Sequence, residues 1–272
     1  MLTTINLLES ILIIYGLSLI IYFIDFIQHD RKAKRTAFWL LCMVLLLQTL
    51  FLLYQIIWNK SFPLGTLIDS LFFYSWILVL FSIIMNILHE NQFIMFVTNI
   101  FGFLVLLIHT SNMAWNDMKS NGIQFANDIL ITHVALTIIS YGFFTLSFIF
   151  SIGYLVHYHL LKHKKQLKWT KRVGNLTKLD VYSFGAVTIG TPLLLIGLML
   201  GFVWAFVSND EFYWFDMKTI GSLFVFVFYI IYLALRLMKG YQGKSIAIFN
   251  TVAFLMLLVN FFLFSLLSNF HF

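Results

Sequence analysis

The sequence has little charge and almost no cysteine, and each shortage excludes a class of protein. Only 10% of its 272 residues are charged and 61% are hydrophobic, whereas an ordinary soluble domain carries about 25% charged residues. This composition excludes a soluble globular domain and indicates an integral membrane protein. The single cysteine, Cys42, excludes an intramolecular disulfide, a Cys-based metal site and a CxxC redox pair within one chain.

Motifs that indicate an enzyme or a secreted precursor are also missing. The sequence contains no nucleophile–base motif, P-loop, HExxH or Rossmann glycine pattern. Its first hydrophobic stretch is too long for the apolar region of a signal peptide, and the basic cluster follows that stretch instead of preceding it. We therefore expect a membrane-embedded protein that is not an enzyme, that contacts membrane lipid and that binds no nucleic acid.

Eight hydrophobic segments are long enough to cross a bilayer. Backbone groups in lipid must be hydrogen-bonded internally, and these segments are too apolar for barrel strands. The sequence therefore predicts an all-α bundle of about eight transmembrane helices, forming a single domain over residues 1–272. The fifth segment would extend about 50 Å as a helix, so its end is expected to project into water. The segments are 4–27, 37–58, 65–88, 92–109, 126–160, 180–207, 219–238 and 245–270.

Lysine and arginine concentrate in alternate loops. Three of the 17 basic residues, Lys60, Lys119 and Lys218, fall on one predicted side of the membrane, and all the others fall on the opposite side. Because cytoplasmic loops carry the excess of Lys and Arg, both termini are predicted to lie outside. The basic loop near 161–179 is expected to enforce this topology and to touch anionic lipid, and protein docking is the alternative role.

An aromatic and acidic stretch, GFVWAFVSNDEFYWFDMK at residues 201–218, joins the sixth and seventh spans and faces outside in this topology. Its aromatic side chains either anchor a helix end at the membrane surface or form a platform for a flat ligand. The sixth span brings glycines to this stretch, and Gly197 and Gly201 have the small-xxx-small spacing that lets another helix approach closely. Room for a flat ligand beside them is the alternative, and Pro192 is expected to kink the helix.

One histidine differs in kind from the others. His133 lies about two turns inside the fifth span, where an ionisable group is costly and indicates a functional site. His109 and His271 end the fourth and eighth spans on the same predicted side. Two neutral imidazoles can clamp a haem iron, although each histidine alone could simply hydrogen-bond a neighbour. The remaining histidines are expected to be interfacial or solvated: His29, His89, His157, His159 and His163.

Two carboxylates lie near the ends of spans. Asp25 is close to the inner end of the first span, and Asp69 is close to the outer start of the third. Both are expected to be caps at the membrane interface. A transporter would use such positions as proton-relay groups, which is the alternative.

Several segments resemble the CcsA/ResC/CcmC cytochrome c assembly superfamily over about residues 126–272. THVALTIISYGFFTLSF resembles its histidine-led helix, GFVWA followed by YWFDMK resembles its tryptophan-rich outer loop, and YLALRLMKGYQGKSIAIFN and VNFFLFSLLSNFHF resemble its last two helices. The resemblance implies non-covalent, b-type haem at the outer loop with a histidine on each side. By position these are His133 and His271, with His109 as the alternative. The implied contacts around the ring are Trp204, Tyr213, Trp214, Phe215 and Asp216.

The chain departs from that superfamily at defined positions. The loop tryptophans are reduced to Trp214, with aromatic residues on either side; the proline of the WD-P-K element is Met217, and the acid that follows it is Thr219. The membrane histidine of a YLHxR-like context is Ala234. The stretch 201–218 is therefore a degenerate form of the outer loop.

With these departures, eight spans and a small size, the chain resembles a branch of the superfamily from Gram-positive bacteria. That branch is encoded with early tetrapyrrole genes and lowers the abundance of glutamyl-tRNA reductase. The resemblance implies a haem-binding regulator in the bacterial cytoplasmic membrane, with the reductase as a direct or indirect partner. The alternatives are a haem transport or handling subunit in cytochrome c assembly, and a scaffold without haem that docks the reductase through the loop near 161–179.

Overall fold

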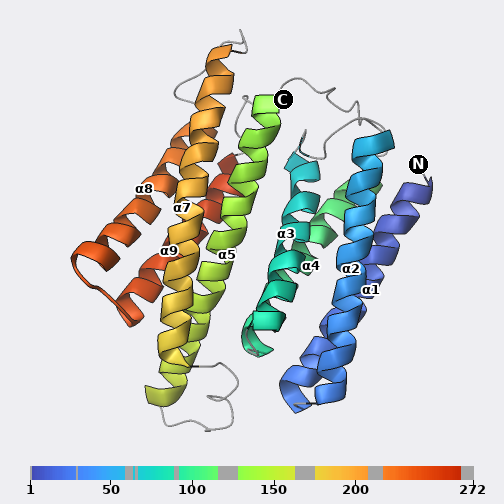
Figure 1. Cartoon of the computed structure of the whole chain (residues 1–272), viewed down its shortest axis with the longest axis horizontal. Helices are drawn as coiled ribbons and strands as arrows, with labels where there is room; N and C mark the ends of the chain where they lie inside the picture. Colours follow the sequence, from blue (N-terminus) through green and yellow to red (C-terminus); the bar gives the residue numbers. More distant parts are fainter. Residues whose placement is uncertain are drawn as a thin grey trace. The chain divides into compact units, whose positions relative to one another are not determined.

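A computed structural model describes residues 2–28, 30–58, 64, 67–88, 92–115, 128–162, 175–207 and 217–264. Over these residues the chain is helical and contains no strand (Figure 1). The last helix continues as a short π-helical segment, η1. The elements are α1 (Leu2–Gln28), α2 (Arg31–Trp58), α3 (Leu67–Leu88), α4 (Gln92–Trp115), α5 (Asp128–Lys162), α7 (Leu176–Val207), α8 (Met217–Met238), α9 (Lys244–Val259) and η1 (Asn260–Phe264).

Eight of these helices are long and apolar enough to cross a membrane, which confirms the predicted spans and the all-α fold. The fifth span is a single helix of 35 residues, as its length suggested. Large apolar side chains such as Ile13, Trp39 and Phe206 are exposed on the outside of the helices, as expected where lipid is the solvent. The orientation with both termini outside stays a prediction.

Two helices begin at least one full turn before their apolar segments. α2 starts at Arg31 and includes the basic cluster, because Asp30 Oδ1 accepts a hydrogen bond from Lys32 N at 2.9 Å. α7 starts at Leu176, where Asn175 Oδ1 accepts from Thr177 N at 2.9 Å. A side-chain acceptor at the N-cap satisfies a backbone N–H of the first turn, so the helix begins where the cap lies and not where the apolar run begins.

The chain forms two compact units. Unit 1, Met1–Ala126, contains α1 to α4; α1 packs against α2 and α4, and α3 packs against the same two helices. Its interior holds large side chains such as Tyr15, Phe51 and Phe72. The ring of four helices therefore encloses its own core.

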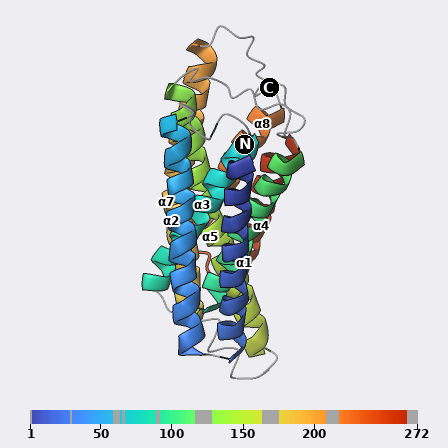
Figure 2. The same ribbon diagram turned by 90° about the vertical axis from the view of Figure 1, so that its right-hand side faces the viewer.

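Unit 2, Asn127–Phe272, contains α5 to η1. α5 runs along α7 and packs against α9, while α8 contacts both α7 and α9 (Figures 1 and 2). Phe144 of α5 stacks on Tyr229 of α8 with ring centroids 3.7 Å apart. α7 remains helical on both sides of Pro192. The α5–α7 pair carries the candidate site described next.

Candidate functional site

Three glycines of α7 bring it close to α5. A Cβ atom added to Gly190 would lie 2.9 Å from the Phe144 ring, and one added to Gly197 would lie 2.7 Å from Thr137 Oγ1. At Gly201 the added atom would lie 2.7 Å from Cε1 of His133. These distances are shorter than ordinary van der Waals contacts, so the glycines permit the approach of the two helices. The predicted helix packing is confirmed, and the alternative of free space for a flat ligand beside Gly197 and Gly201 is wrong, since α5 fills it.

The imidazole of His133 is oriented by the backbone of α7. Its Nδ1 lies 2.5 Å from the carbonyl oxygen of Gly197, and its ring lies over the Cα of Gly201. A carbonyl oxygen only accepts, so Nδ1 carries the hydrogen and donates it. In the neutral imidazole this leaves Nε2 with its lone pair as the acceptor or ligand atom.

This arrangement suits an iron ligand. Metal-ligating histidines usually donate the other ring N–H to a carbonyl or carboxylate, which fixes the tautomer and the ring orientation. His133 is partly buried, and Thr137 donates to its carbonyl oxygen at 2.8 Å, which anchors the same turn of α5. Trp204, also partly buried, follows Gly201 by three residues and lies on the same side of α7. Among the described residues, His133 would therefore supply an imidazole ligand to a haem iron, and Trp204 would supply an aromatic side chain on the same side of α7.

The other predicted contacts belong to segments that the structure leaves undescribed. The second ligand, His271, and four members of the aromatic platform lie outside the described residues and stay predictions: Tyr213, Trp214, Phe215 and Asp216. Among the residues that the structure does describe, no group of three or more His, Cys, Asp or Glu side chains could hold a bare metal ion.

His109, the alternative ligand, is placed differently from the prediction. α4 continues six residues beyond it to Trp115, so His109 lies within the helix instead of at its end. Its side chain is 1% exposed inside unit 1, with its ring 5.3 Å from that of Phe72. Iron ligation by His109 would require opening this core. The apolar run ends at His109, but the helix continues through polar residues, so hydropathy placed the helix end too early.

The other two histidines in the described part of the chain lie near the end of α5, and they differ in exposure. His157, expected to be interfacial or solvated, is 7% exposed on α5, so its side chain is not solvated. His159, two residues further along the same helix, is exposed as expected. Consecutive positions of a helix face different directions, and sequence proximity to a basic loop does not reveal which face is covered.

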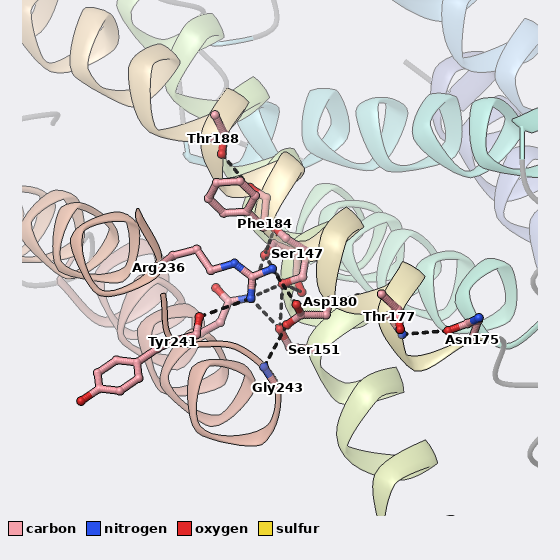
Figure 3. Close-up of polar contacts among 12 residues, drawn as sticks. Ser147, Ser151, Asn175, Thr177, Asp180, Phe184, Thr188, Arg236, Tyr241 and Gly243 are labelled. Atoms are coloured by element: carbon pink, nitrogen blue, oxygen red, sulfur yellow. Dashed lines mark hydrogen bonds and ion pairs between the residues drawn. The ribbon is translucent and has the colours of Figure 1, made fainter. Parts of the chain in front are cut away.

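An ion pair that the sequence analysis missed fixes the opposite end of α7 and α8. Arg236 Nη2 donates to Asp180 Oδ2 at 2.6 Å, with side chains only 8% and 11% exposed (Figure 3). Gly243 N donates to the other oxygen of Asp180 at 3.3 Å, and the guanidinium lies 5.1 Å from the Phe184 ring centre. The pair joins the turn between α8 and α9 to the start of α7. Charged residues inside two apolar spans were the signal for it.

A buried polar cluster, also missed, ties α9 to α5 and α7. Asn250 Nδ2 lies 2.7 Å from Ser147 Oγ, 2.8 Å from Ser151 Oγ and 3.2 Å from Ser183 Oγ. All four residues are almost completely buried. Polar side chains in membrane helices commonly hydrogen-bond across helices in this way. Together, the polar cluster and the ion pair hold the helices of unit 2 to one another at the end remote from His133.

The fold and this site define a class of protein: a multi-pass, all-helical membrane protein with a histidine held between two of its helices. The family model of the Cytochrome C assembly protein matches residues 64–271, and the chain belongs to that family. It is 44% identical to Protein HemX of Bacillus subtilis over 97% of this chain and 95% of that protein. It is 34% identical to Protein HemX of Brevibacillus brevis over 95% and 94%.

A more distant relative has a name from cytochrome c biogenesis. The chain is 31% identical to the cytochrome c biogenesis protein CcsA of Chlamydomonas reinhardtii, over 76% of this chain and 59% of that protein. The predicted superfamily is thereby confirmed, and within it the chain is similar to HemX proteins. The chain is a multi-pass protein of a bacterial membrane.

Proposed function

We propose that this protein is a haem-binding membrane regulator that lowers the level of glutamyl-tRNA reductase. The observation that carries the proposal is the imidazole of His133, held at Nδ1 by the Gly197 carbonyl with its ring against Gly201. Similarity to HemX proteins over almost the whole length of both chains supports a regulatory role in preference to a role in cytochrome c assembly. Ala234, in place of the membrane histidine of the superfamily, supports the same choice.

The residues that would hold haem follow from the described geometry and from the resemblance. Nε2 of His133 and the imidazole of His271 would hold the iron, while Trp204 and the loop aromatics would provide a stacking surface. When bound, haem would supply a flat group with an iron that imidazole nitrogens can ligate. The Gly197 carbonyl keeps the proton of His133 on Nδ1, which leaves Nε2 available to the iron.

The α5–α7 pair is the element through which occupancy of the site would reach the cytoplasm. His133 lies in the second turn of α5, and the helix runs on without a break to Lys162. Its close contact with α7 depends on glycines, so a shift of the imidazole changes how the two helices pack. Haem can bias this packing only if it binds one arrangement better than the other.

The experiment compares cells that lack the chromosomal gene and carry the wild-type protein, His133→Ala or the matched control His159→Ala. His159 lies on the same helix but is exposed at its other end. Immunoblots should show low reductase with the wild-type protein and the control, and high reductase with His133→Ala. Covalent cytochrome c should be the same in all strains. Loss of cytochrome c in the deletion, with reductase unchanged, contradicts regulation and supports the assembly role.

A further inference from the structure

Unit 1 encloses a line of polar side chains along its helical interior. Asp25 is 2% exposed and Gln92 9%, while Gln48, Ser75 and Asn99 are fully buried. Asp25, expected to be a cap at the membrane interface, lies near the end of α1, is buried in the bundle and accepts a hydrogen bond from Gln92, the first residue of α4. Polar and ionisable residues inside a membrane bundle are costly and commonly mark ion or proton paths. We call the whole set the polar column: Tyr15, Tyr22, Asp25, Gln48, Gln55, Ser75, Ser82, Asn86, Gln92 and Asn99.

Hydrogen bonds join the middle of the column across all four helices. Tyr15 OH donates to Asn99 Oδ1 at 3.3 Å, and Asn99 Nδ2 donates to Ser82 Oγ at 2.9 Å. Gln48 Nε2 donates to Ser75 Oγ at 3.3 Å, and Ser75 Oγ donates to the carbonyl of Gly102 at 2.9 Å. Because Gly102 has no side chain, the Tyr15 hydroxyl also fits beside its backbone. The bonds of Tyr15 and of Ser75 therefore lie at the same level of the bundle.

The column continues toward the ends of α1 and α3. Asn86 Nδ2 donates to the Tyr22 hydroxyl at 3.1 Å, and Gln92 Nε2 donates to Asp25 Oδ1 at 3.1 Å. On α3 the members Ser75, Ser82 and Asn86 are spaced by seven and four residues, which places them on one face at intervals of about 10 Å and 6 Å. The column therefore occupies several successive levels of the bundle.

Three glutamine side-chain carbonyls lie along the same line. Oε1 of Gln92, Gln48 and Gln55 is buried and has no hydrogen-bond partner among the described residues. Gln48 and Gln55 are seven residues apart on α2, so both lie on one face. Buried acceptors are normally paired, and internal water is their usual partner. Water at these three levels would bridge the intervals between the hydroxyl groups.

We propose that the polar column is a proton path through unit 1, with Asp25 as the group that takes up and releases the proton. The Asp25 carboxylate binds a proton to become a carboxyl group. Each hydroxyl or water along the column then accepts one proton and passes its own to the next oxygen. Only O–H bonds form and break, no electron is transferred, and a proton gradient or membrane potential drives the movement. Of the titratable side chains near this end of the column, Tyr22 on α1 lies beside Asp25, and Cys42 on α2 lies beside Tyr22.

Proton flux into vesicles tests the path. The full-length protein is reconstituted into liposomes that contain a pH-sensitive dye, and a potassium diffusion potential with valinomycin drives proton entry. Wild-type vesicles should acidify faster than empty ones, and Asp25→Asn should slow this by at least about tenfold. Ser18→Ala is the matched control: Ser18 is buried on the same helix, but its hydroxyl donates to the Ala37 carbonyl, outside the column, and its flux should equal that of the wild type.

The opposite results overturn the proposal. If wild-type vesicles acidify no faster than empty ones, or if Asp25→Asn conducts like the wild type, the column serves only to hold the four helices together. Should Asp25→Asn fail to fold, as judged by thermal unfolding in detergent, Gln48→Leu is measured instead. This change keeps the volume and the Ser75–Gly102 bond but removes a carbonyl, so it should also reduce the flux.

Discussion

Replacement of Gly201 by alanine tests the His133 arrangement without touching the ligand itself. The new Cβ would lie 2.7 Å from Cε1 and 2.8 Å from Nδ1 of His133. Ordinary contacts begin near 3.4 Å, so the ring must retreat by about 0.7 Å. Its Nδ1 is bonded to the Gly197 carbonyl on the same helix, and the retreat therefore stretches this bond. The matched control is Gly185→Ala, where the added atom meets nothing within 4 Å.

The expected changes in the free energy of unfolding have opposite signs in the two variants. Alanine is favoured over glycine in a helix by about 1 kcal/mol, which is the whole expected effect at position 185. At position 201 the same gain is opposed by an overpacking cost of about 1–3 kcal/mol and by the loss of a hydrogen bond of about 1 kcal/mol. Gly201→Ala should therefore be less stable than Gly185→Ala by roughly 2–4 kcal/mol. Loss of the hydrogen bond that orients a metal ligand typically weakens the metal site by about 10–100-fold.

Two measurements on purified protein test these expected differences in stability and in haem affinity. Thermal unfolding in detergent should rank Gly185→Ala at or above the wild type and Gly201→Ala below it. Titration with haem, followed by visible absorption, should show weaker binding only for Gly201→Ala. Equal stability and equal haem affinity in the two variants would refute the contact between the imidazole and Gly201, and with it the role of α7 in orienting the ligand.

Two further predictions concern the other end of the molecule. Arg236→Ala leaves the carboxylate of Asp180 buried without its cation and should lower the free energy of unfolding by about 3–5 kcal/mol, measured by thermal unfolding. The double change with Asp180→Ala should recover part of this loss. An unchanged unfolding midpoint in Arg236→Ala contradicts a fixed ion pair. Charge reversal in the basic loop should abolish regulation and leave the haem spectrum intact if this loop docks the reductase, and persistence of low reductase on immunoblots excludes the loop as the docking surface. The residues to reverse are Lys164, Lys165, Lys168 and Lys171.

The number and type of the helices could be predicted because the length of an apolar run nearly determines a transmembrane helix. Helix ends could not be placed as well, since they depend on caps such as Asp30 and Asn175 and not on hydropathy. The same limit explains the error at His109, where α4 continues through polar residues into its last turns.

The candidate site was only partly predictable for a different reason. The glycine spacing on α7 and the isolated histidine on α5 were both visible in the sequence. Their contact depends on the register between two helices whose residues Gly197 and His133 are 64 positions apart, and spacing within one segment carries no information about that register. The same holds for Asp180 and Arg236, 56 positions apart, and for Asp25 and Gln92, 67 apart.

The central claim is that His133 ligates haem, and a visible spectrum of purified protein tests it most directly. Wild-type protein and His159→Ala, both supplied with haem, should show the bands of a haem with two histidine ligands. His133→Ala should lose these bands or bind haem more weakly, and His271→Ala should do the same. A spectrum and a haem affinity in His133→Ala that equal those of the wild type would contradict the account.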